Sequence, residues 1–226
     1  MNQSLSQEEF WTPVILSVKV SILSAIIAFI LALAAALFMN SRRFVGRTAL
    51  ETIFMLPLVL PPTVVGFLLL VSFGRRSIIG KMYESMFHMP IVFTWGAAVI
   101  AASAVAFPLA YQTIKTGLAS LDKDLLSAGR SLGASEWQLL RYVIAPLVKR
   151  SLVTAFILAF ARSLGEFGAT LMLAGNIPGR TQTLPTAIYM ASESGDMTQV
   201  WLWTGLMVFI SFLLLTVAGP HTRRSE

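Results

Sequence analysis

The chain has 226 residues, of which 56% are hydrophobic and only 12% charged, and its mean hydropathy is +0.74. These values are typical of an integral membrane protein and exclude an ordinary soluble domain. The formal net charge is +6, but no basic stripe carries interleaved aromatic residues, so we expect contact with anionic lipid and not with nucleic acid. Since there is no cysteine, disulfides, thiol catalysis and cysteine metal sites are excluded. Residues 1–10 are polar and lack a basic run, so we do not expect a cleavable signal peptide.

Five apolar stretches are long enough to cross a hydrocarbon core of about 30 Å, which takes roughly 20 helical residues. We therefore expect an all-α, polytopic membrane protein in which residues 1–226 form a single transmembrane domain. The expected spans are residues 14–39, 52–74, 89–114, 147–173 and 197–220.

The distribution of Lys and Arg predicts how the chain is oriented. With five spans the connections alternate between two sides, and eleven Lys and Arg fall on one side against four on the other. The larger group is Arg42, Arg43, Arg47, Lys115, Lys123, Arg130, Arg141, Lys149, Arg150, Arg223 and Arg224. Cytoplasmic loops carry the excess of basic residues, so the N-terminus is expected outside and the C-terminus inside. Arg75, Arg76 and Lys81 oppose this assignment without reversing it.

The second span contains three prolines, Pro57, Pro61 and Pro62, within six residues. Each proline removes a backbone donor and clashes with the preceding turn, so an unbroken helix is not expected. Opened backbone at membrane depth is tolerated where it is buried in protein or lines water. The pattern therefore predicts a kinked helix that lines a pathway, or else a kink that serves packing alone.

The fourth span carries one pair of charges, Arg162 and Glu166, four residues apart in the stretch 159–170. On a continuous helix this spacing places both side chains on one face. An unpaired charge in lipid costs about 2.5–3.5 kcal/mol on insertion scales, so the pair is expected to face protein or water. Gly165 and Gly168 remove bulk where another backbone could approach. The pair is either a structural link between helices or part of a route or gate for a polar solute.

The connection at residues 118–150 is too apolar for a bare loop. It reads as two short helices around a turn, with Asp122 or Asp124 capping the first, Gly133 ending it and Ser135 capping the second. Its apolar side chains are Leu125, Leu126, Leu132, Trp137, Leu139 and Leu140. These side chains need a protein partner, or the pair of helices lies on the underside of the membrane.

Two motif-like stretches do not support an enzyme. Residues 129–133 match the pattern G-x-S-x-G, but the local pattern is helical and neither His88 nor His221 is placed to serve as its partner. Residues 74–81 imitate a phosphate-binding loop with one residue too many and Met82 in place of Ser or Thr. We therefore expect no nucleotide-hydrolysis site, no metal site, no cofactor and no catalytic residue.

The connection at 118–150 resembles the EAA loop of ABC-importer permeases. That loop reads Glu-Ala-Ala, three residues, Gly, nine residues, Ile, one residue, Leu-Pro. Here the same spacing runs through Ser127, Ala128, Gly129, Gly133, Val143, Ala145 and Pro146. The stretches at residues 56–62, 160–170 and 176–189 are similar to the molybdate permease family, whose near relatives carry tungstate and sulfate.

The resemblance implies a type I ABC-importer permease in a bacterial cytoplasmic membrane. It implies a permease homodimer, two cytoplasmic ABC ATPase subunits that supply ATP hydrolysis, and an extracytoplasmic molybdate-binding protein. The residues it assigns to ATPase coupling are Ser127, Ala128, Gly129, Gly133, Ala134, Trp137 and Pro146. The candidates for the pathway or gate are Pro57, Pro61, Pro62, Arg162, Ser163 and Glu166. The alternatives are the same machinery for tungstate or sulfate and, more remotely, a membrane scaffold without transport.

Overall fold

Helices make up the regular structure of this chain, as the apolar pattern predicted. The computed structural model describes residues 7–41 and 44–222, so Arg42, Arg43, Arg223 and Arg224, which entered the orientation argument, lie outside the described residues. In chain order the elements are α1 (Gln7–Ser41), α2 (Arg47–Val59), α3 (Pro62–Phe73), α4 (Ile78–Phe87), α5 (Trp95–Ala119), α6 (Lys123–Ser131), α7 (Glu136–Leu139), a π-helical turn (Leu140–Ile144), α8 (Ala145–Leu164), α9 (Gly168–Ala174), α10 (Leu184–Glu193) and α11 (Met197–Thr222).

Among the described residues, four helices are long and apolar enough to cross a membrane: α1, α5, the continuous helix Glu136–Leu164 and α11. A fifth span exists if α2 and α3, whose axes are bent by 116°, count as one. The prediction of five spans therefore holds only with a broken second span. The third span also begins later than expected, at Trp95, because the hydroxyl of Thr94 caps α5 by accepting from the Ala97 amide at 3.1 Å.

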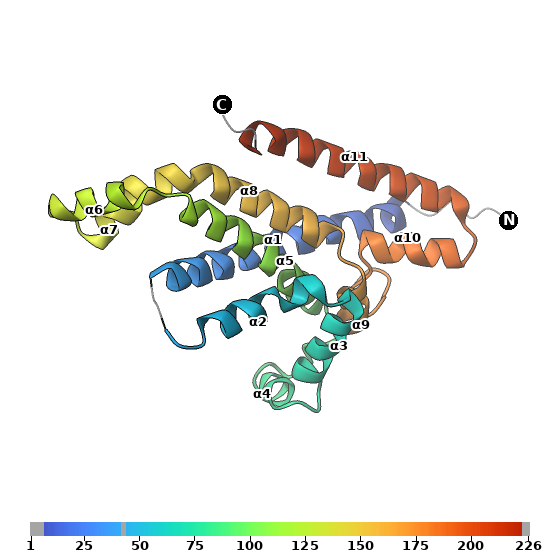
Figure 1. The fold of residues 1–226 in the computed structure, drawn as a ribbon. Coiled ribbons are helices and arrows are strands. Elements are labelled where there is room, and N and C mark those ends of the chain that lie inside the picture. The colour runs from blue at the N-terminus through green and yellow to red at the C-terminus, as the bar shows by residue number, and fades with distance from the viewer. Residues whose placement is uncertain (1–6, 42–43, 223–226) are drawn as a thin grey trace.

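The long helices α1, α5 and α8 form the centre of the molecule, and α11 lies along α8 (Figure 1). The helices α6 and α7 project at the end opposite α10 and the N-terminal end of α1 (Figure 1). The helices α3 and α4 leave the direction of the long helices and run across it (Figure 1). Each end of the long bundle therefore carries its own short helices.

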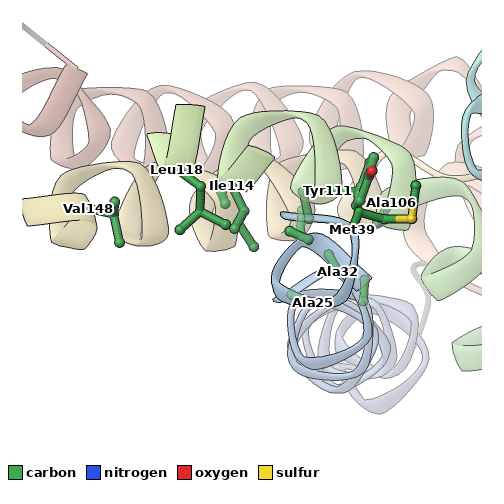
Figure 2. Packing of buried hydrophobic residues seen from close by; sticks show 13 residues of the cluster. Ala25, Ala32, Met39, Ala106, Tyr111, Ile114, Leu118 and Val148 are labelled. Carbon is green, nitrogen blue, oxygen red and sulfur yellow. The ribbon is translucent and has the colours of Figure 1, made fainter. Parts of the chain in front are cut away.

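Buried alanine residues of α1 form part of the contact between the central helices. Ala25, Ala28, Ala32 and Ala36 repeat at helical spacing along one face of α1, and all are buried. They pack with buried residues of α5 and α8 in one apolar cluster, part of which Figure 2 shows. Within lipid, small residues let helix backbones approach, and close van der Waals packing then holds the helices together. The contact between α1 and α5 is accordingly extensive.

Two short helices of the structure were not predicted. The connection at residues 75–94 contains α4, which Ser77 caps by accepting from the Gly80 amide at 2.8 Å. The connection at 175–196 contains α10, whose first amide, from Leu184, donates to the Ser17 hydroxyl of α1 at 2.6 Å. Both helices are too short to span a membrane, and both lie in stretches that the sequence analysis treated as connections between spans.

Candidate functional site

The second span breaks at two consecutive prolines. Leu60 precedes Pro61 and Pro61 precedes Pro62, and both residues adopt extended backbone, with ψ of 143° and 137°. A residue before proline is pushed away from the helical region, so two such residues in a row redirect the chain. Pro62 then starts α3, where its missing amide hydrogen costs nothing. The predicted kink is therefore a full break, while Pro57 stays inside α2.

The fourth span also breaks. Arg162 lies in the last turn of α8, which ends at Leu164, and Glu166 lies between α8 and α9. The prediction that both residues share one continuous helix was wrong, but the ion pair exists, with Arg162 Nη1 2.9 Å from Glu166 Oε2. The other carboxylate oxygen of Glu166 accepts from the Ala169 amide at 2.8 Å and so satisfies a free donor in the first turn of α9. Exposed side-chain fractions are 1% for Glu166 and 28% for Arg162, so the pair faces protein.

The second halves of the two broken spans, α3 and α9, pack directly on each other. A Cβ atom on Gly66 of α3 would lie 2.8 Å from Ala169 Cα and from Met172 Cβ of α9. A Cβ atom on Gly168 would lie 3.1 Å from Pro62 Cβ. The expected close approach is thus confirmed at Gly168 but not at Gly165, where a Cβ would meet its neighbours only at 3.9–4.0 Å. Gly66 was missed, although a glycine inside an apolar membrane segment is a signal for helix contact.

Buried hydroxyl groups lie next to the Glu166 carboxylate. They come from α1, from the end of α8, from α9 and from the start of α10: Ser17, Ser21, Ser163, Thr170 and Thr183. The Ser163 hydroxyl has no hydrogen-bond partner among the described residues. The gap between these side chains is too small for a water molecule. In this conformation the polar region around the break is therefore closed and dry.

The two predicted helices of the connection at 118–150 are α6 and α7, which we call the coupling helices. The Asp122 carboxylate caps α6 by accepting from the Asp124 amide at 2.8 Å. Gly133 has φ of +85° and ends the turn after α6, as its position predicted. Ser135 and Gln138 form a reciprocal capping box at the start of α7, with bonds of 3.2 and 2.8 Å.

Gly129 allows the coupling helices to meet. A Cβ on Gly129 would lie 2.6 Å from Leu139 Cδ2, so a larger residue there would force the buried Leu139 side chain to move. Arg130 donates two hydrogen bonds to Glu136, at 2.7 and 3.3 Å, which join the same two helices. The hydrogen bonds to Glu136, together with its negative charge, raise the pKa of Arg130 above its usual range.

The coupling helices surround an open hollow of about 370 Å³. It is lined by Gly129, Leu132, Gly133, Ala134, Gln138, Leu139, Tyr142 and Val143. Leu132, Trp137 and Tyr142 are exposed at 89%, 66% and 70%, so this end of the molecule presents apolar surface that its own chain leaves uncovered. Ser127 and Ala128 belong to α6 beside the hollow, and Pro146 lies beyond it in the first turn of α8.

The second coupling helix does not end before Pro146, as the sequence reading assumed. It runs without interruption into the fourth span, as the helix Glu136–Leu164. Pro146 has no amide hydrogen and crowds the carbonyl one turn earlier, and the wide π turn Leu140–Ile144 lies in the turn before it. The coupling helix and the membrane span are thus one continuous helical element.

Comparison with known proteins decides the family. Residues 24–220 match the model of the family described as binding-protein-dependent transport system inner membrane component. The chain belongs to this family. YvgM of Bacillus subtilis (strain 168) is 55% identical over 212 residues, covering 94% of this chain and 93% of YvgM. The molybdenum transport system permease protein ModB of Escherichia coli (strain K12) is 42% identical over 179 residues, covering 79% and 78% of the two chains.

Solved structures of ABC transporters share the fold. A chain of a bacterial alginate ABC transporter, in complex with an alginate-bound periplasmic protein, matches with a TM-score of 0.76 at 17% identity, over 97% of this chain and 80% of that one. A chain of the inward-facing methionine transporter MetNI matches with a TM-score of 0.68 at 17% identity, over 97% and 100%. The protein is thus a multi-pass membrane component of an ABC importer with the type I permease fold, and a transport subunit as predicted.

Proposed function

We propose that this chain is the permease subunit of an ATP-driven, binding-protein-dependent importer of molybdate. The observation that carries this proposal is its similarity, over most of its length, to proteins named as molybdenum transport permeases, among them ModB of Escherichia coli. Tungstate and sulfate share the tetrahedral shape and charge of molybdate, so they are the alternative substrates and the experiment below includes them.

The proposed pathway passes between two copies of the chain, next to the contact between α3 and α9. The breaks at Pro61–Pro62 and at Gly165–Phe167 support this, because half-helices that end inside a span can change angle while the long helices stay in place. Arg162 is not expected to bind the anion tightly, since Glu166 partly neutralises it. Conduction also requires binding weak enough to permit release. Ser163 and the hydroxyl groups beside it would line the route once the contact opens.

The proposed partners are a second permease copy, two cytoplasmic ATPase subunits and an extracytoplasmic molybdate-binding protein. The hollow between the coupling helices, with its uncovered apolar rim, is the proposed seat of the ATPase. An alternative, contact of this surface with the underside of the membrane, would leave the hollow without a role. This arrangement puts the coupling helices in the cytoplasm, the N-terminus outside and the C-terminus inside, with residues 1–226 as one transmembrane domain.

The experiment is ATP turnover by the chain reconstituted in vesicles with its ATPase and binding protein, titrated separately with molybdate, tungstate and sulfate. Stimulation by molybdate at low concentration, with sulfate inert, supports the proposal. Stimulation by tungstate or sulfate alone keeps the importer and replaces the substrate. An assembled complex that none of the three anions stimulates would leave a membrane scaffold without transport.

A matched pair of variants tests the seat of the ATPase. Leu132→Glu places a charge on the most exposed apolar side chain of the hollow and should prevent co-purification of the ATPase. Val45→Glu introduces the same charge at a still more exposed apolar residue between α1 and α2 and should leave the complex intact. Loss of the ATPase in both variants, or in neither, would contradict this position.

A further inference from the structure

The helix α2 is held mainly by one neighbour. Of the described residues of α2, none is fully buried, and its principal packing partner is α5. Phe54 meets Phe107 and Tyr111 of α5 edge to face, with ring centroids 5.4 and 5.3 Å apart. An ion pair one turn nearer the N-terminal end of α2 also joins the two helices. The angle of α2 therefore depends chiefly on its contacts with α5.

That ion pair joins Glu51 to two cations. One carboxylate oxygen accepts from Lys115 Nζ of α5 at 3.0 Å, and the other accepts from Arg47 Nε of α2 itself at 3.4 Å. The exposed fractions of the Glu51 and Lys115 side chains are 23% and 36%. Only the bond to Lys115 crosses between helices. Because the pair is partly hydrated, it can separate and form again at far smaller cost than the buried Glu166 pair.

Lys115 lies close to the first coupling helix. The helix α5 ends at Ala119, and only Ser120 and Leu121 separate it from Asp122, the cap of α6. This short junction is ordered, because Ser120 donates its amide to Thr116 O at 3.1 Å and its hydroxyl to Gly117 O at 2.8 Å. A displacement of α6 would therefore be transmitted through this junction to Lys115. At its other end, α2 terminates in the break before Pro61.

We infer that Glu51 is a positioning residue through which the first coupling helix sets the angle of α2. When α6 moves with the ATPase, Lys115 moves, and the Glu51–Lys115 bond carries α2 about the break at Leu60–Pro61. The inference rests on the proposed function, since it assumes an ATPase that moves α6. It assigns Glu51 no contact with the transported anion.

The test uses the reconstituted complex of permease, ATPase and binding protein, with ATP turnover measured with and without anion-loaded binding protein. Glu51→Gln keeps the size of the side chain and removes its charge. We expect the ratio of stimulated to basal turnover to fall about fivefold or more, the lower end of typical coupling between sites, while assembly and melting temperature stay near wild type. A purely structural role would instead lower the melting temperature and leave the ratio unchanged.

Arg47→Gln is the matched control, because it removes the bond within α2 and leaves the bond to α5. The ratio of stimulated to basal turnover in this variant should equal that of the wild type. Lys115→Met should reproduce Glu51→Gln, and the double variant should be no worse than either single variant, because both changes break the same bond. A wild-type ratio in Glu51→Gln, an equal loss in Arg47→Gln, or additive losses in the double variant would each overturn the inference.

A second measurement does not depend on turnover. Since the chain has no cysteine, Cys substitutions at the exposed Leu56 of α2 and Phe67 of α3, on either side of the break, can be joined by a bifunctional thiol reagent while Glu51 and Lys115 stay in place. The yield of the cross-link should change when ATP binds to the assembled complex. A yield independent of ATP overturns the inference even where the wild-type complex is stimulated by the anion. If no anion stimulates the wild type, the proposed function itself fails.

Discussion

The contact between α3 and α9 can be tested with one methyl group. In Gly66→Ala the new Cβ would lie 2.8 Å from Ala169 Cα and Met172 Cβ, whereas carbon atoms pack at about 3.5–4.0 Å. The two half-helices must therefore separate by about 1 Å. Overpacking of this kind costs about 1–3 kcal/mol, and the better helix propensity of Ala returns about 1 kcal/mol. We expect a net loss of up to about 2 kcal/mol in the free energy of unfolding.

The control is Gly205→Ala in α11, where a new Cβ meets nothing within 4 Å. It gains the same helix propensity without the clash, so its melting temperature should equal or exceed that of the wild type. Melting temperatures of the detergent-purified proteins compare the two variants, and anion uptake reports whether the contact also opens and closes. A Gly66→Ala protein as stable and as active as Gly205→Ala would refute the close packing of α3 on α9.

Replacing Arg162 by Ala leaves the Glu166 carboxylate buried with a single backbone donor. We therefore expect the free energy of unfolding to fall by about 3 kcal/mol, which is the low end for a broken buried pair because Arg162 is partly exposed. Unchanged expression, assembly and uptake would contradict this, and adding Glu166→Gln should restore most of the stability. At the coupling helices, Gly129→Val forces the new side chain against Leu139. This variant should lose stimulated ATP turnover while the purified permease stays folded. Normal stimulation would show that the angle between α6 and α7 does not matter for coupling to the ATPase. Tyr111→Phe removes a buried hydroxyl that has no partner among the described residues, so thermal denaturation should show unchanged or slightly higher stability, and a clear loss would reveal a hydrogen bond that the structure does not show.

Local signals in the sequence predicted the local structure well. Apolar length located the spans, and the short polar residues Asp122 and Ser135 located the starts of both coupling helices, because a cap depends only on residues two or three positions away. The ion pair between Arg162 and Glu166 was also found from spacing alone. These features need no knowledge of how distant segments meet.

Features that depend on distant segments were not predicted. The break after Leu164 was read as continuous helix because residues 165–173 are apolar apart from Glu166 and Thr170. The structure shows the break, with the Glu166 carboxylate capping α9. Gly66 and Ala169, which pack on each other, lie about a hundred positions apart in the chain. No local pattern in the sequence can therefore predict their contact. The Glu51–Lys115 bond likewise spans 64 positions, although each residue alone looks like an ordinary charge near a helix end.

The wide turn at Leu140–Ile144 sets the rotational phase of the fourth span. A π turn holds one residue more than the corresponding α turn, and each residue of an α-helix advances the direction of the side chains by roughly 100°. Deleting one residue there, together with Pro146→Ala, would give a regular helix of nearly the same length. Because the wide turn already absorbs the extra residue, Arg162 would still point toward Glu166, whereas winding all the present residues as a regular α-helix would turn Arg162 about a quarter-turn away. The wide turn thus lets this helix carry one extra residue without rotating the membrane span relative to the coupling helix.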